Sequence, residues 1–264
     1  MASNQPEPLR VGYVPEHFST PLHLAQLHGQ YGGTTISFHP YPSGTGHMIQ
    51  SLRADEIDVA IGLTEGWIAG IKGPLKADWY KVIGQTAAIM SFVLALQQHG
   101  WIAGAAGGQP PFEFVVLDNF KNLRDAVNSG AADAFMWEHF TSKKFYDTGE
   151  IKRIGEIYTP WPSWLITARS ALVEARDPRL GSFLDGVNWG IAHFRANPEQ
   201  SIEWITANLE YSEEDAKEWR KGVRFVDDVK RVDLGIVEKV IDTLKGAGVV
   251  EHGQDIDGVV VLVD

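Results

Sequence analysis

The sequence has 264 residues, of which 44% are hydrophobic and 22% charged, and it contains no cysteine. The formal net charge of −11 argues against nucleic acid or an anionic membrane as the main partner, because either would be repelled over most of the surface. Without cysteine the chain has no disulfides, no thiolate catalysis and no cysteine-ligated metal.

The N-terminal residues 1–8 lack the basic start and the apolar run of a secretory signal. No apolar stretch in the sequence reaches the length needed to cross a bilayer. We therefore expect no membrane insertion and a cytoplasmic location.

Strands and helices are predicted to alternate over the first part of the chain, which is typical of α/β proteins. Apolar runs predict strands at 9–14, 34–39, 57–63, 80–84 and 112–117. Helices are predicted at 21–28, 48–53, 67–71 and 88–96, and the Gly-rich stretch 104–111 predicts a flexible connection. Together these elements predict a parallel or mixed α/β sheet.

The last third of the sequence is predicted to be mostly helical. Asn197, Pro198 and Gln200 predict a helix start, with Asn197 as the N-cap and Gln200 closing a capping box. The stretch from Ser212 to Asp215 predicts another start, and apolar residues recur at helical spacing between 236 and 244. A terminal strand is predicted at 258–263.

A helix followed by a short apolar strand occurs twice in the sequence. The first unit, 48–63, ends at Thr64 and Glu65. The second, 123–137, has its predicted strand at 132–137 and ends at Glu138. Ligands of open α/β sheets bind outside the carboxyl ends of the strands, so this repeat predicts two lobes that face one cleft. Short patterns of this kind also arise by chance in other α/β proteins.

Two strings carry a family resemblance, one from Trp137 to Thr141 and one from Thr159 to Trp164. With 9–16, 43–66 and 118–124, they resemble a fungal branch of the type 2 periplasmic-binding-protein fold. This branch is similar to the solute-binding proteins for alkanesulfonates, taurine and nitrate, and to the thiamine pyrimidine-precursor synthases. The resemblance covers most of the chain and implies two α/β lobes with a small molecule held between them.

Under this resemblance, lobe 1 comprises 8–86 and 165–264, and lobe 2 comprises 87–164. The crossing strands would lie near 82–86 and 154–166. In the family, the first crossing is normally followed by a helix, a strand and a Gly-Ser loop that lines the ligand. Here 84–87 runs almost directly into the next helix, so lobe 2 is predicted to be shortened, without that strand and one wall of the pocket.

Acidic residues stand at three places that the predicted cleft would include. Glu16 and His17 follow the first predicted strand, and their Glu-His-Phe triplet recurs at Glu138. If these places face one cleft, Glu16, Glu65 and Glu138 favour a ligand with cationic or amide-like donors, such as an aminopyrimidine or an amine.

The ends of the repeated strands supply further candidates. Thr64 and Glu65 close the first unit, and Trp137 and Glu138 close the second. Their position favours a role in the cleft, and the alternative is a pair of solvated loops that contact nothing.

A helix start forms the next candidate group, with Ser43, Gly44, Thr45 and Gly46. Free backbone N–H groups and the helix dipole favour an anion or a polar oxygen at such a place. The alternative is an N-cap at Thr45 flanked by turn glycines.

The return crossing supplies the last group, with Trp161, Ser163 and Trp164. Tryptophan rings provide a large flat contact area for a ligand at a small entropic cost. The alternative is that both tryptophans pack the lobes together.

Catalysis finds little support in the sequence. It contains no Gly-x-Ser-x-Gly elbow, no phosphate-loop motif and no His-Glu-x-x-His zinc helix. A metal site between His17 and His139 is the one arrangement that the histidines suggest. The thiamine-precursor synthases carry a cysteine-rich signature, which a chain without cysteine does not have. We therefore predict no catalytic residues, no metal and no cofactor.

The sequence thus predicts a non-catalytic small-molecule-binding protein that closes two lobes over its ligand, as a carrier, buffer or sensor. One alternative is an enzyme of thiamine or pyridoxal metabolism. Another is a shortened member of the family that binds nothing and acts through protein contacts.

Overall fold

The computed structural model describes residues 7–86, 113, 115–156 and 161–263. Its strands are β1 (Leu9–Tyr13), β2 (Ile36–Pro40), β3 (Val59–Leu63), β4 (Tyr80–Gln85) and β5 (Trp164–Arg169). Its helices are the short η1 (His17–Ser19), α1 (Thr20–Leu27), α2 (Thr45–Arg53), α3 (Thr64–Lys72), α5 (Phe120–Ser129), α6 (His139–Asp147), α7 (Ser170–Glu174), α8 (Pro178–Ala196), α9 (Pro198–Asn208), α10 (Glu213–Gly222) and α11 (Leu234–Gly246).

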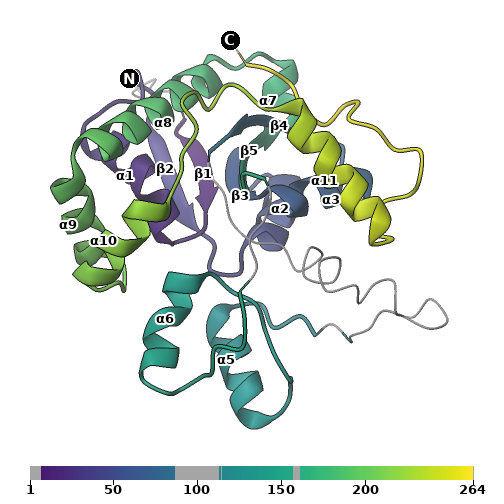
Figure 1. The fold of residues 1–264 in the computed structure, drawn as a ribbon. Coiled ribbons are helices and arrows are strands. Elements are labelled where there is room, and N and C mark those ends of the chain that lie inside the picture. Colours follow the sequence, from purple (N-terminus) through teal and green to yellow (C-terminus); the bar gives the residue numbers. More distant parts are fainter. Residues whose placement is uncertain (1–6, 87–112, 114, 157–160, 264) are drawn as a thin grey trace.

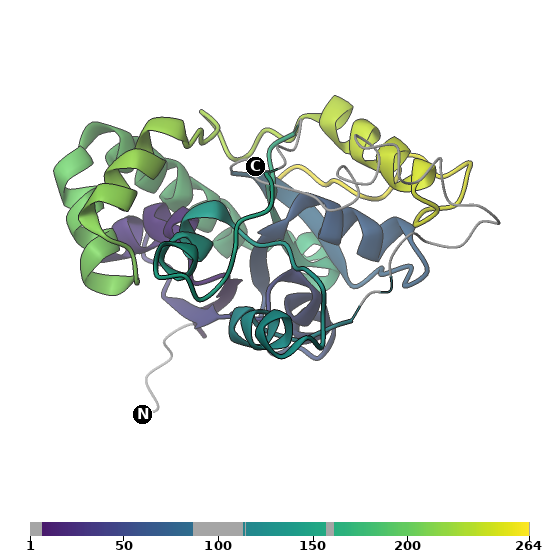
Figure 2. The same cartoon turned by 60° about the horizontal axis from the view of Figure 1, so that its bottom comes forward.

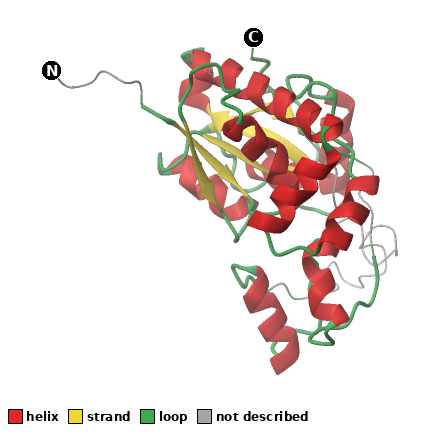
Figure 3. Cartoon of the chain, turned by 90° about the vertical axis from the view of Figure 1, so that its left-hand side faces the viewer, coloured by secondary structure: helices red, strands yellow, loops and turns green. Residues whose placement is uncertain are grey.

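The strands of the described residues form one mixed sheet in the order β2-β1-β3-β5-β4. β1 pairs in parallel with β2 and β3, whereas β5 runs antiparallel between β3 and β4. Helices α1 and α2 connect the parallel strands, since parallel pairing requires a crossover. The predicted α/β class is therefore confirmed, and Figure 3 shows the strands between layers of helices.

The core of the molecule lies on the two faces of this sheet. Helices α1 and α8 pack together on one side, and α3 and α11 pack together on the other (Figure 1). Val59 in β3 and Leu165 and Ile166 in β5 are fully buried. Continuous apolar runs such as these are typical of strands that are covered on both faces.

The two strands predicted in the middle of the chain are wrong for the residues that the structure describes. Residues 113, 115–117 and 132–137 have no regular secondary structure, and Val116 is 87% exposed. Residues 112 and 114 lie outside the described residues. A strand needs a neighbour that pairs with its backbone groups, and no described segment pairs with either run. The repeat is confirmed in α2 and β3, but its second unit has only its helix, α5.

The chain leaves and re-enters the sheet through neighbouring strands. Gln85 at the end of β4 pairs with Leu165, and the Thr86 amide donates to the Trp164 carbonyl at 2.8 Å. Between these points, α5 and α6 form a pair below the sheet in Figure 1 and in front of it in Figure 2. The return strand begins at Trp164, whereas the predicted crossing began near 154.

Three predictions fall on residues that the structure does not describe. They are the helix at 88–96, the Gly-rich connection at 104–111, and the missing strand and Gly-Ser loop after residue 87. They therefore stay predictions, as do the boundaries of the two lobes.

The predicted helix starts are confirmed in position, but not always in their capping contacts. In α10 the Ser212 hydroxyl accepts from the Asp215 amide at 3.1 Å, as predicted. In α9 the Asn197 side chain instead donates to the His193 carbonyl at 3.0 Å, and the Gln200 amide oxygen lies 2.5 Å from His193 Nε2. The predicted capping box is therefore wrong, because His193 in the preceding helix binds both side chains.

The C-terminal prediction is confirmed only in part. The apolar face of α11 is buried at Val237, Val240, Ile241 and Leu244. The predicted terminal strand is a single parallel bridge between Val260 and Val82. This segment therefore extends the β4 edge of the sheet by one bridge.

The Ser212 cap leads to a first testable prediction. Ser212→Ala should lower the free energy of unfolding by about 1 kcal/mol, because the Asp215 amide loses its acceptor. Urea unfolding would measure the change. Ser182→Ala, in the second turn of α8 and away from its N-cap, is the matched control and should change stability by less than about 0.5 kcal/mol. An equal loss in both variants would contradict a capping role.

Candidate functional site

Glu16 and His17 are buried on the loop that follows β1. The loop turns tightly, since the Ser19 hydroxyl donates to the Glu16 carbonyl at 2.6 Å and the Thr20 hydroxyl donates to the His17 carbonyl at 2.7 Å. These local bonds satisfy the backbone and hold both side chains at the end of the strand.

Glu138 is the N-cap of α6 and is also buried. Its carboxylate accepts from the Thr141 amide at 2.7 Å and from the Thr141 hydroxyl at 3.0 Å. A carboxylate at this place satisfies a free N–H group of the first turn and interacts favourably with the helix dipole.

The structure brings Glu16, His17 and Glu138 together. The Thr141 hydroxyl lies 3.5 Å from Glu16 Oε1, and His17 Nε2 lies 3.6 Å from Glu138 Oε1. The Thr141 hydroxyl also lies 2.8 Å from the Tyr211 hydroxyl. Residues from the loop after β1, from α6 and from the segment before α10 therefore meet at one place, which we call the Glu16 cluster: Glu16, His17, Glu138, Thr141 and Tyr211.

Aromatic rings enclose the histidine of this cluster. The His17 ring stacks on Tyr211 with a centroid distance of 4.5 Å and lies 4.2 Å from the Trp219 ring. Phe140 contacts it edge-on at 6.1 Å. The Trp137 indole nitrogen is buried here without a hydrogen bond of ordinary geometry, although it lies near Glu16.

Burial dominates the electrostatics of the cluster. It raises the pKa of Glu16 to about 8, with a further contribution from the charge of Glu138, and it raises the pKa of Glu138 to about 7. Burial also holds the pKa of His17 well below its ordinary value. Among the described residues, no lysine or arginine forms an ion pair with Glu16 or Glu138. The cluster is therefore acidic and has no permanent positive charge of its own.

Thr64, Glu65, Trp161 and Ser163 form a second group at the end of β3. The Thr64 amide donates to the Ser163 carbonyl at 2.7 Å, and the Trp161 indole donates to Glu65 Oε2 at 3.5 Å. Burial raises the pKa of Glu65 to about 7. The two groups are linked by neighbouring residues, since Phe18 stacks on Trp164 with a centroid distance of 5.9 Å.

The helix start at Ser43 to Gly46 lies beside this second group. The N-cap of α2 is Gly44, at φ 76°, so the alternative of an N-cap at Thr45 is wrong. Thr45 is the first helical residue, and its hydroxyl accepts from the Leu63 amide at 2.8 Å, next to Thr64. The Ser43 hydroxyl bonds to His47 Nδ1 at 2.7 Å. The Thr45 hydroxyl therefore does not cap the helix but joins α2 to the backbone at the end of β3.

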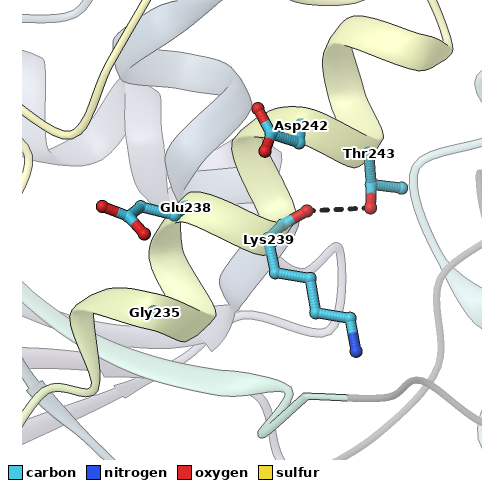
Figure 4. Close-up of a pocket in the computed structure, with 5 residues that line it drawn as sticks. All are labelled: Gly235, Glu238, Lys239, Asp242 and Thr243. Carbon is cyan, nitrogen blue, oxygen red and sulfur yellow. Dashed lines mark hydrogen bonds between the residues drawn. The ribbon is translucent and has the colours of Figure 1, made fainter.

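Two hollows among the described residues are lined by other residues than those of the Glu16 cluster. Trp164 and Phe18 line a cavity of about 20 Å³, which has room for about one water molecule. A larger open hollow of about 420 Å³ lies on α11 and is lined by Gly235, Glu238, Lys239, Asp242 and Thr243 (Figure 4). None of these five is a predicted site residue.

The structure does not bring His17 and His139 together as metal ligands. His139 Nδ1 lies 3.4 Å from Glu156 Oε1, and its Nε2 lies 3.3 Å from the Tyr146 hydroxyl. In the described part of the chain, no group of three or more acidic or histidine side chains is placed to hold a metal ion. No described helix combines the length and apolarity that crossing a membrane requires.

Comparisons with known proteins identify the family. A family model described as Ca3427-like PBP matches residues 80–157. A solved structure of the Candida albicans CA3427 gene product is 36% identical, with 98% of this chain and 97% of that chain covered and a TM-score of 0.86. This chain belongs to the Ca3427-like family. That family is described as exhibiting the generic periplasmic binding protein structural fold.

Other structures share the fold of this Ca3427-like protein at low identity. The zinc-bound ligand-binding component of an ABC-type import system from Staphylococcus aureus is 11% identical, covers 97% of both chains and has a TM-score of 0.70. The aliphatic sulphonate binding protein SsuA from Escherichia coli is 16% identical, covers 98% of this chain and 94% of its own, and has a TM-score of 0.60. A search of curated proteins found no match. The predicted type 2 periplasmic-binding-protein fold is confirmed.

Sequence reasoning missed three residues of the Glu16 cluster and its aromatic shell. Thr141 ends the string from Trp137 that carries the family resemblance, and this was its only signal. Tyr211 and Trp219 lie in the helical last third, where no motif distinguished them. The roles of all these residues in ligand binding stay predictions.

Proposed function

We propose that this Ca3427-like protein is a non-catalytic small-molecule-binding protein whose ligand lies at the Glu16 cluster, between two lobes. In this proposal, lobe 1 comprises 8–86 and 165–264, and lobe 2 comprises 87–164. The fold supports the proposal, since proteins that share it are described as ligand-binding and sulphonate-binding proteins.

One observation carries this placement of the site. Glu16 and Glu138 are buried within reach of one hydroxyl group, and among the described residues neither has a lysine or arginine partner. Burying carboxylates without a cation costs free energy, which a bound ligand with positive charge or N–H donors would offset. The ligand we propose is therefore a small polar molecule of this kind, such as an aminopyrimidine, a thiamine fragment or an amine.

The remaining predicted residues would complete the walls of the site. Glu65 and Trp161, already in contact, would lie at one side of the ligand, with Trp164 and Ser163 behind them. The Ser43 to Gly46 helix start would border the same side. Opening would separate α6 from the loop after β1, because the contacts of Thr141 close that interface.

A thermal-shift screen tests the proposal. The panel contains aminopyrimidines, thiamine and its fragments, pyridoxal phosphate, sulfonates and polyamines. A ligand at about a hundred times its dissociation constant should stabilise the folded protein by about 2.7 kcal/mol, or 5–10 °C in Tm. The matched controls are Glu138→Gln, which should weaken the shift, and Glu150→Gln on the exposed surface, which should not. A flat response across the panel would favour a member of the family that binds no small molecule.

A further inference from the structure

The two carboxyl groups of the Glu16 cluster share one hydroxyl group. The Thr141 hydroxyl lies 3.0 Å from Glu138 Oε2, 3.5 Å from Glu16 Oε1 and 2.8 Å from the Tyr211 hydroxyl. A hydroxyl carries a single proton, so Thr141 donates to only one carboxylate at a time. If both carboxyl groups were ionised, two buried negative charges would share this hydroxyl, and the other donors, the Thr141 amide at Glu138 and the Trp137 indole near Glu16, are neutral.

The histidine beside these carboxyl groups does not supply the missing charge. The His17 side chain is 1% exposed, and neither of its ring nitrogens has a hydrogen-bond partner. Its Nε2 points to Glu138 at 3.6 Å, which is longer than a hydrogen bond. The ring is packed between Tyr211 and Trp219, and burial favours its neutral form.

The other charged groups near the cluster are already paired. Lys143 on α6 lies 3.3 Å from Asp215 on α10 and also pairs with Asp147. The titratable groups that face the two carboxyls are therefore His17 from η1 and Tyr211 from the segment before α10. Neither is positively charged at neutral pH in this setting.

We propose that the place between Glu16 and Glu138 holds one proton in the ligand-free protein and binds a cationic N–H donor ligand in exchange for it. This inference rests on the proposed function, narrows its ligand class to a cation and adds the coupling of binding to pH. The exchange balances, because one cation enters as one proton leaves to the solvent. Anions such as sulfonates are excluded from this place by the two carboxyl groups, unlike the ligand named for the SsuA relative.

The sign of the pH dependence follows from the direction of the shifts. Both carboxyls have an ordinary pKa of 4.5 when exposed, and burial raises the pKa of Glu16 to about 8 and that of Glu138 to about 7. Their contribution to stability is full below pH 4.5 and is lost as the pH rises through 7 to 8. The affinity for a cationic ligand rises with pH, because the cation competes with the proton for the same place.

Three probes of one shape and different charge test the ligand class. Benzamidinium is a planar cation with N–H donors, benzamide is neutral, and benzenesulfonate is an anion. Titration calorimetry at pH 6 and pH 8.5 should give a benzamidinium affinity that rises roughly tenfold or more with pH. At pH 7.5, between the two pKa values, two buffers with different ionisation heats should report the release of about one proton per bound cation. Benzamide and benzenesulfonate should bind at least about tenfold more weakly at pH 8.5.

Variants test whether the two carboxyl groups hold a proton in the ligand-free protein. The Tm of the wild-type protein should fall from pH 6 to pH 8.5, and Glu138→Gln should reduce that fall, because glutamine does not ionise and can still accept from Thr141. Glu16→Gln is a second variant in case the first folds poorly. Glu150→Gln, which removes an exposed carboxylate paired with Arg124, should keep the wild-type pH dependence.

Each contrary outcome overturns one part of this proposal. Equal benzamidinium affinity at both pH values, or the same fall in Tm for all three variants, overturns the exchange of ligand for proton. Tighter binding of benzamide or benzenesulfonate overturns the cationic ligand class while the small-molecule function stands. If no probe binds, the ligand class also fails, and the broad panel then decides separately whether the proposed function holds.

Discussion

Asp58→Ala is expected to lower the free energy of unfolding by about 3 kcal/mol, because it removes the buried anion of an ion cluster. The Asp58 side chain is 5% exposed and lies between two arginines. It accepts from Arg10 Nε at 3.0 Å and from the Arg10 backbone amide at 2.9 Å, and Arg169 donates to it at 2.9 Å. Without Asp58, two guanidinium groups would lose their most buried partner.

Asp55 provides the matched control for this variant. It pairs with the same two arginines, but its side chain is 62% exposed. Its φ of 61° lies in the left-handed region, which asparagine tolerates, so Asp55→Asn changes the charge without straining the backbone. This control should cost less than about 1 kcal/mol. Urea unfolding measures both, and equal losses would show that burial does not set the strength of this cluster.

Gly190→Ala is expected to destabilise the fold by about 3 kcal/mol, because α1 and α8 approach too closely for a side chain. A Cβ atom at Gly190 in α8 would lie 2.0 Å from the carbonyl oxygen of Pro21 in α1 and 2.8 Å from its carbon. These are backbone atoms, so neither can rotate away, and the two helices would have to separate. Thermal and urea unfolding would both report the loss.

Gly222→Ala at the end of α10 is the control for the loss of a glycine. A Cβ atom there would meet nothing within 4 Å, and alanine favours the helix more than glycine does. The variant should be neutral or more stable by up to about 1 kcal/mol. If Gly190→Ala were as mild, the close approach of α1 and α8 would not limit the packing of the core.

Local patterns predicted four of the five strands and two helix starts of the described residues. The strands from β1 to β4 and the starts of α9 and α10 lie where periodicity and helix-start signals placed them. The strands predicted at 112–117 and 132–137 were wrong for the described residues, since a strand forms only when a distant neighbour pairs with it. At Asn197 and Gln200, a side chain of the preceding helix replaced the local capping bond.

The sequence by itself determined the α/β class, the family and the acidic candidates Glu16, Glu65 and Glu138, because these depend on periodicity, on local strings and on residue type. Only the tertiary structure decided which acids meet. Glu16 and Glu138 come together through Thr141, and Tyr211 closes the cluster from the helical last third. These contacts join residues that are far apart in the chain. Burial and pairing set the charge state of the acids, and no local sequence pattern encodes either one.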